Sequence, residues 1–154
     1  MAQETDFRSE YNKIKQKLPS FDELNNDFEI AAITDKAVPL RAIRRKIMEK
    51  VLKYMAILES VIQPETHFTD LYESKFFSEN ERHEILILYK KLKQFERETY
   101  EIALNEDDKD NSDFINSFFS EWKSMKKQLV PLMKKLKNSW KEESKDREVI
   151  GYFG

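Results

Sequence analysis

The sequence predicts an all-α fold, an elongated helical bundle of three long antiparallel helices plus two short N-terminal helices. Only two glycines and four prolines occur among the 154 residues, which leaves little material for the tight turns between β-strands. Lysine, glutamate and leucine are abundant, and all three favour helix. In three long segments the apolar residues recur at steps of three and four, the period of a helix with one buried face.

Two short helices are expected first. One should cover residues 5–17 and end before Pro19, because the residue that precedes a proline disfavours helical geometry. Its apolar stripe consists of Phe7, Tyr11, Ile14 and Leu18. Ser20 followed by Glu23 fits a capping box, in which each side chain accepts a hydrogen bond from a free backbone N–H. The inward residues of this second helix should be Phe21, Leu24, Phe28 and either Ala31 or Ala32.

The first long helix is predicted from Pro39 to about Gln63, where Pro64 stops it. Its buried stripe should be Leu40, Ile43, Ile47, Val51, Met55, Leu58 and Ile62. Residues 64–78 are expected to form a connection with one or two helical turns at 69–74. Its many aromatic residues indicate that it packs against the core.

The second long helix should begin after Ser78, which with Glu81 repeats the capping-box spacing. Its seam is Ile85, Leu88, Leu92, Phe95, Thr99 and Ile102. A polar loop is expected over residues 105–112, and the third long helix from about Asp113. The seam of that helix is Ile115, Phe118, Trp122, Met125, Leu129, Leu132 and Leu136. Two such helices with a short connection favour an antiparallel hairpin.

Pro131 lies inside the third long helix, where a proline removes one backbone hydrogen bond. Because the seam continues past it, a kink is expected rather than a break. Residues 1–145 are expected to form a single helical-bundle domain, and residues 146–154 a C-terminal tail.

The sequence predicts no catalytic residue, metal site, cofactor or small-molecule substrate. There is no cysteine, and glycine occurs only at positions 151 and 154, so thiolate sites and glycine-rich phosphate loops are excluded. The two histidines, His67 and His83, lack the Glu-x-x-His or His-Glu-x-x-His spacing of metal sites. No apolar run reaches the roughly 20 residues of a membrane span, and the polar start is unlike a targeting signal. A cytoplasmic protein without a membrane partner is expected.

The favoured function is a non-catalytic interaction module, an adaptor or accessory subunit that binds another protein or its own copy. The candidate interface is an apolar strip that would join the last helix to the tail. It comprises Met133, Leu136, Trp140, Ile150, Tyr152 and Phe153. The tail could also fold back over Trp140, and this alternative is slightly preferred.

The runner-up is an accessory protein that binds RNA or DNA through a basic helical face. Residues 121–145 hold eight lysines against three acids, although the whole chain has a net charge of −2. The candidate contacts are Arg41, Arg44, Arg45, Lys126, Lys127 and Lys134. The alternative is that these side chains form the solvated backs of amphipathic helices. A bundle enzyme is the least favoured class.

Overall fold

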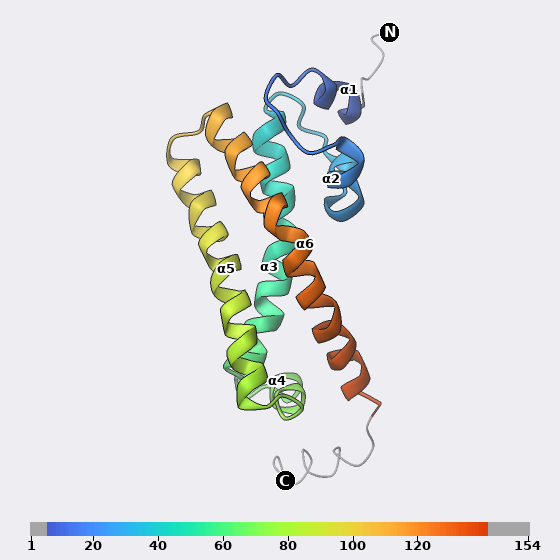
Figure 1. Ribbon diagram of the computed structural model, residues 1–154, viewed down its shortest axis with the longest axis vertical. Helices are drawn as coiled ribbons and strands as arrows, with labels where there is room; N and C mark the ends of the chain where they lie inside the picture. The colour runs from blue at the N-terminus through green and yellow to red at the C-terminus, as the bar shows by residue number, and fades with distance from the viewer. Residues whose placement is uncertain (1–5, 142–154) are drawn as a thin grey trace. The chain divides into compact units, whose positions relative to one another are not determined.

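The computed structural model describes residues 6–141, and within that range all regular secondary structure is helical, with no strand (Figure 1). The elements are α1 (Phe7–Asn12), α2 (Phe21–Phe28), η1 (a 3₁₀ helix, Ile30–Ala32), α3 (Pro39–Ile62), α4 (Phe68–Ser74), α5 (Glu79–Leu104) and α6 (Asp108–Ser139). The predicted all-α fold is confirmed.

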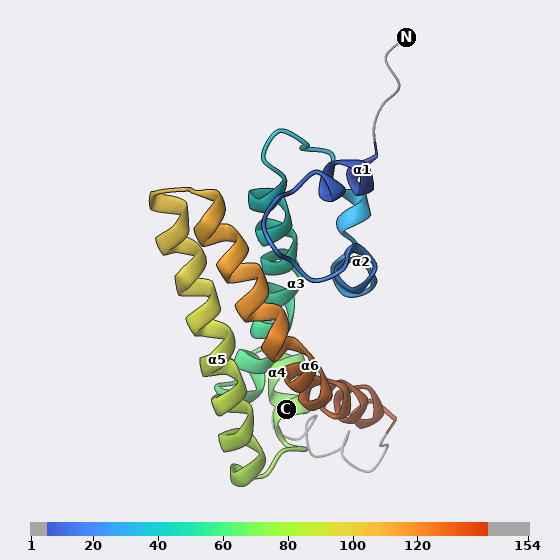
Figure 2. The ribbon, with the colours of Figure 1, turned by 45° about the horizontal axis from the view of Figure 1, so that its top comes forward.

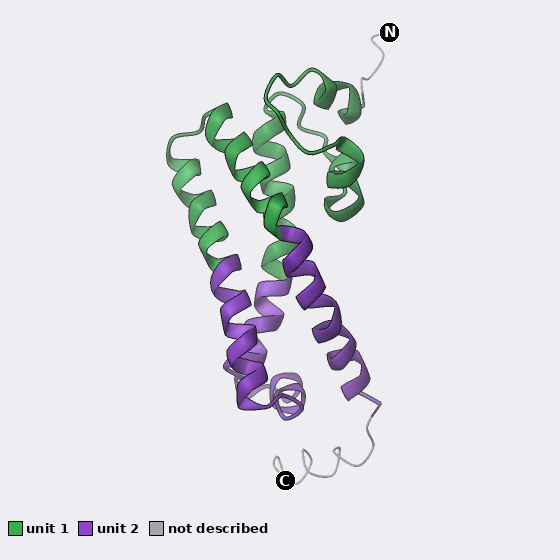
Figure 3. Ribbon diagram, in the orientation of Figure 1, with its two compact units in different colours: residues 1–53, 93–121 green, residues 54–92, 122–154 purple. Residues whose placement is uncertain are grey.

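The chain forms two compact units, and each long helix contributes residues to both (Figure 3). Unit 1 comprises residues 1–53 and 93–121, and unit 2 comprises residues 54–92 and 122–154. The antiparallel arrangement of the three long helices along their whole length stays a prediction, and so does a single domain over residues 1–145.

Several predicted helix ends are confirmed. Ser20 and Glu23 form the capping box of α2. At the start of α5, the backbone N–H of Ser78 donates to Glu81 (3.1 Å) and the N–H of Glu81 donates to the Ser78 hydroxyl (3.2 Å). The helix α3 begins at Pro39 and ends one residue before Gln63.

The helix α1 is shorter than predicted, because it ends at Asn12 instead of continuing to residue 17. The backbone N–H groups of Lys13 and Ile14 donate to the carbonyls three residues earlier, of Glu10 and Tyr11, so the last turn tightens and the helix ends. Two further hydrogen bonds fix the segment that follows. The Tyr11 hydroxyl donates to the carbonyl of Pro19, and Asn116 Nδ2 donates to the carbonyl of Lys17 (2.7 Å).

The inward residue after α2 is Ile30, and both Ala31 and Ala32 are exposed. The cause is Glu29, which adopts a left-handed backbone conformation (φ 55°) and ends α2. The chain therefore continues as η1 with a shifted inward face.

The helix α6 begins at Asp108, five residues before the predicted start at Asp113. Asp107 caps it: its Oδ1 accepts a hydrogen bond from the backbone N–H of Asp110 (2.7 Å). Asp108 and Asp110 lie in the first turn, where negative charge complements the helix dipole. Much of the acidic stretch that was predicted to be a loop therefore forms the capped start of α6. The connection between α5 and α6 covers only residues 105–107.

In unit 1 the core is built on phenylalanine. The Phe118 ring lies 5.1 Å from Phe95 and 5.7 Å from Phe28, both edge-on. These contacts join α2, α5 and α6, and Figures 1 and 2 show the adjoining parts of α5 and α6 side by side. The predicted seam residues of α3 within this unit, Leu40, Ile43, Ile47 and Val51, are buried.

In unit 2 most predicted seam residues are buried as well. They are Met55, Leu58, Ile85, Leu88, Leu92, Trp122, Met125, Leu129 and Leu136. Ile62 and Leu132 are only partly buried. The connection 64–78 contains α4 close to its predicted position, with Tyr72 and Phe77 buried.

Pro131 is exposed and lies within a continuous α6, so the helix is not divided at this residue. A proline has no N–H and cannot donate to the carbonyl four residues earlier.

Pro131→Ala should therefore raise the free energy of unfolding by about 1–3 kcal/mol, because alanine restores that hydrogen bond. Urea denaturation followed by circular dichroism measures the change. Gln128→Ala, at another exposed position of α6, is the control and should change stability by less than about 0.5 kcal/mol. A loss of stability in Pro131→Ala would show that the proline ring makes a packing contact worth more than the missing bond.

Candidate functional site

A buried arginine connects the long helices within unit 1. The Arg44 side chain of α3 is only 4% exposed. Its Nε donates to Asn111 Oδ1 (2.7 Å) and its Nη1 to the carbonyl of Thr99 (3.2 Å). Its Nη2 donates to the carboxylate of Glu106, which follows α5. One guanidinium thus links α3, α5, the 105–107 connection and α6.

Glu106 is the acidic centre of this cluster. Its side chain is 16% exposed, and Arg41 Nε lies 3.4 Å from its second oxygen. Burial raises the pKa of Glu106, but the hydrogen bond from Asn111 and the charges of Arg44 and Arg41 outweigh it and hold the pKa below its ordinary value. Burial lowers the pKa of Arg44, and Glu106 opposes that shift.

The prediction that Arg44 belongs to an exposed basic face is therefore wrong. A side chain this deep and this fully hydrogen-bonded would have to break the cluster to reach a phosphate. Arg41 is half-buried beside Glu106, and Arg45 alone of the three is exposed. Residue 44 is four residues from both Leu40 and Met48, which places it next to the apolar stripe of the helix. This position was the signal in the sequence that could have predicted the burial of Arg44.

An aromatic surface lies where α4 meets the end of α6, within unit 2. We use this name for Phe68 and Trp140, each 47% exposed, with ring centroids 6.3 Å apart. Buried Tyr72 supports both: its ring stacks on Trp140 at 4.3 Å and on Phe68 at 5.9 Å. Its hydroxyl donates to the carbonyl of Ser139 (2.7 Å), and Trp140 Nε1 donates to Glu73 Oε2 (3.0 Å).

The composition of the candidate protein interface changes accordingly. Leu136 is 7% exposed, so its inclusion in an exposed strip is wrong; it faces the core as the last buried seam residue. Met133 is half-buried. The expected contributions of Ile150, Tyr152 and Phe153 lie outside the described residues. The exposed partner that sequence reasoning missed is Phe68, because nothing in its local pattern separates it from the buried Tyr72.

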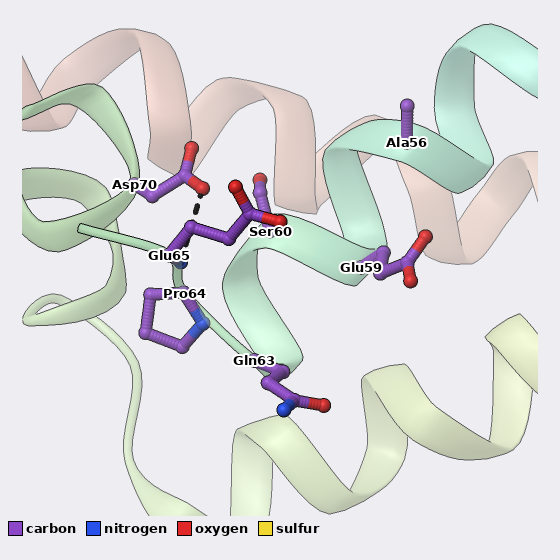
Figure 4. Close-up of a pocket in the computed structure, with 7 residues that line it drawn as sticks. All are labelled: Ala56, Glu59, Ser60, Gln63, Pro64, Glu65 and Asp70. Atoms are coloured by element: carbon purple, nitrogen blue, oxygen red, sulfur yellow. Dashed lines mark hydrogen bonds between the residues drawn. The ribbon is translucent and has the colours of Figure 1, made fainter. Parts of the chain in front are cut away.

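A surface pocket of about 490 Å³ lies at the C-terminal end of α3 (Figure 4). Glu59, Glu65 and Asp70 bring three carboxylates to its lining, and Asp70 accepts a hydrogen bond from the backbone N–H of Glu65 (3.2 Å). The helix C-terminus adds partial negative charge, so this pocket favours cations over anions. His67 Nε2 lies 3.3 Å from Glu65, but no group of three or more potential metal ligands converges within residues 6–141.

A second hollow of about 320 Å³ lies between α5 and α6 in unit 2, beside Pro131. Ile85, Leu88 and Leu132 make much of its lining apolar. Lys135 closes one side through an ion pair with Glu81 (2.5 Å). It has the character of a groove between packed helices and brings together no acid–base pair suited to catalysis.

The lysines of the alternative interface lie on the outside of α6. Lys126, Lys127 and Lys134 are all exposed. They belong to unit 2, whereas Arg41 and Arg45 belong to unit 1.

Comparisons with known proteins found no match for this chain. No protein-family model matches the chain, and neither the curated proteins nor the solved structures contain a significant match. Across the described helices, none is long and apolar enough to cross a membrane.

Glu106→Gln should destabilise the fold by about 3 kcal/mol, because it leaves the buried Arg44 guanidinium without its counter-charge. The wild-type stability should also fall on acidification. The pKa of Glu106 is depressed in the folded state, so its contribution is present above the ordinary glutamate pKa and is lost as pH falls through the depressed value. Urea unfolding across this pH range measures both effects.

Exposed Glu101 provides the matched control, and Glu101→Gln should shift stability by less than about 0.5 kcal/mol. If Glu106→Gln were as mild as this control and kept the wild-type pH dependence, the cluster would not be a stabilising ion pair.

Proposed function

We propose that this protein is a non-catalytic helical interaction module, an adaptor or accessory subunit that binds another protein or its own copy through the aromatic surface of Phe68 and Trp140. The observation that carries the proposal is the half-exposed, rigidly supported pair of rings. Tryptophan and other large aromatic side chains supply much of the binding energy at protein interfaces.

Preorganisation supports this assignment. The Tyr72 hydroxyl satisfies the carbonyl of Ser139 near the end of α6, a group that has no partner inside the helix. The hydrogen bond from Trp140 to Glu73 fixes the indole from its edge. A partner would therefore meet rings that are already ordered, and association would cost little side-chain entropy.

The ionic cluster and the two hollows described above, all within residues 6–141, support the non-catalytic part of the proposal. Arg44 and Glu106, the buried ion pair of unit 1, neutralise each other. The pocket at the end of α3 is lined by three carboxylates, Ser60 and Gln63, and the Ser60 hydroxyl donates to the carbonyl of Ile57 (2.7 Å) and not to a carboxylate. The hollow beside Pro131 has a largely apolar lining with one ion pair. In neither does a hydrogen bond join a nucleophile to a base.

Phe68→Ser should weaken the association by about 30-fold, the effect of losing about 2 kcal/mol at an interface hot spot. Sedimentation velocity over a range of protein concentrations measures self-association, and capture from the native cell measures binding to other proteins. Trp140→Ala should act in the same direction. Leu104→Ser, at a leucine that is 90% exposed in unit 1, is the control and should leave binding unchanged.

The proposal would be contradicted if the wild type were a monomer at every concentration and captured the same proteins as the Phe68→Ser/Trp140→Ala double variant. Truncation after Lys145 tests the tail separately. Stronger association of the truncated chain would indicate that the tail competes for the aromatic surface.

A further inference from the structure

The hollow between α5 and α6 in unit 2 has the size and lining of a site for an extended chain. We call it the Pro131 groove. Ile85 and Leu88 of α5 and Leu132 of α6 line it with aliphatic carbon, and its volume is about 320 Å³. One turn of helix, about 5.4 Å long and 10 Å across, would need more than ~400 Å³. The groove is therefore too small for a helix and suits one or two side chains of an extended segment.

Pro131 gives the groove a main-chain acceptor. A proline has no backbone N–H, so residue 131 cannot donate to the carbonyl of Lys127, which lacks its usual intrahelical donor. Pro131 is exposed and lines the groove, so this carbonyl lies beside the aliphatic hollow. Extended segments dock by combining main-chain hydrogen bonds with pockets for their side chains. The Pro131 groove offers both.

We propose that a C-terminal segment of the same chain, residues 149–153, which lies outside the described residues, binds in the Pro131 groove. The seven residues before it contain no large apolar side chain, whereas the segment itself has four: Val149, Ile150, Tyr152 and Phe153. Apolar side chains concentrated in this way favour a site away from water. Gly151 has no side chain, so the backbone of the segment can approach the two helices closely.

The length of the chain allows this placement. The described residues end at Lys141, eight residues before Val149. Eight extended residues span up to about 26–29 Å. The first and last residues of α6 that line the groove, Gln128 and Lys135, lie about 20 and 9 Å before Lys141 at 1.5 Å per residue. The segment therefore reaches the whole groove, and so short a tether keeps it at an effective concentration on the order of millimolar.

Charge complementarity supports the same occupant. The connecting residues 142–148 contain four acids and two bases. Lys127 lies four residues before Pro131 and Lys134 three residues after it, so both share its side of α6, and both are exposed. The rim on α5 carries exposed Glu84, which repels an acidic connection. The connection is therefore expected along the α6 rim, with residues 149–153 in the groove.

This inference goes beyond the proposed function and does not depend on it. It concerns the Pro131 groove and leaves the rings of Phe68 and Trp140 available to a partner. The groove has apolar side chains on two helices, so a side chain inserted between them contacts both. Truncation after Lys145 should then leave association through the two rings unchanged.

The test uses the absence of cysteine from the chain, because a single introduced cysteine then reports on one place only. The rate of modification by a thiol reagent is measured for the groove variant Gln128→Cys, in the full chain, with and without Ile150→Ser/Phe153→Ser. A tether at about 1 mM effective concentration and a local Kd of about 0.1 mM would keep the segment bound about nine-tenths of the time. Modification should therefore be about tenfold slower with the natural segment than with the substituted one.

Lys137→Cys is the matched control, because residue 137 is exposed on α6 in the same unit and does not line the groove. Its modification rate should be the same with the natural and the substituted segment. Thr69→Cys, exposed next to Phe68, tests the aromatic surface in the same way and should also show no difference. None of these rates requires a protein partner, so they test the segment separately from the proposed function.

The proposal is overturned if Gln128→Cys reacts equally fast with the natural and the substituted segment. Protection of Thr69→Cys in place of Gln128→Cys would also overturn it, because the segment would then cover the aromatic surface. Protection of Gln128→Cys should be the same at low and high protein concentration. If it grows with concentration, the segment comes from a second copy and the proposal is wrong.

Discussion

The constraint on which the structure depends is that each long helix must remove one apolar face from water. In unit 1 this is achieved by α3 and by the phenylalanines of α2, α5 and α6, and in unit 2 by a second set of seam residues that includes Trp122. Once these faces are buried, only the outward faces and the helix ends remain for binding. The surface proposed for binding follows from this division, because the rings of Phe68 and Trp140 stay half-exposed at the end of α6.

Within unit 1, Arg44 is the exception that shows how strongly position on a helix governs a side chain. It lies among apolar residues of α3, and the fold surrounds it with Glu106, Asn111 and a backbone carbonyl. Removing one partner of such a cluster is costly, because it leaves a buried charge without compensation. An arginine that sequence reasoning assigned to binding instead joins α3 to α5, to the 105–107 connection and to α6 through hydrogen bonds.

Much of the fold was predictable because the apolar period and the capping residues are local signals. The limits of α3 and the capping boxes at Ser20 and Ser78 required only neighbouring residues. The predictions failed where residues that are distant in the sequence determine the local structure. The segment after α1 is held by bonds to the carbonyls of residues 17 and 19, one of them from Asn116. The exposure of Phe68 beside buried Tyr72 depends on how α4 meets α6. The continuity of α6 through Pro131 was predicted, because the apolar seam continues on both sides of the proline.

The central claim, that buried seams leave binding to the outward faces, is tested most directly by NMR. Spectra of the uniformly ¹⁵N-labelled full chain would be recorded while a soluble paramagnetic gadolinium chelate is added. The account predicts that the indole N–H signal of Trp140, 47% exposed, broadens, while that of the seam residue Trp122, 2% exposed, does not. Equal broadening of the two indole signals would contradict it.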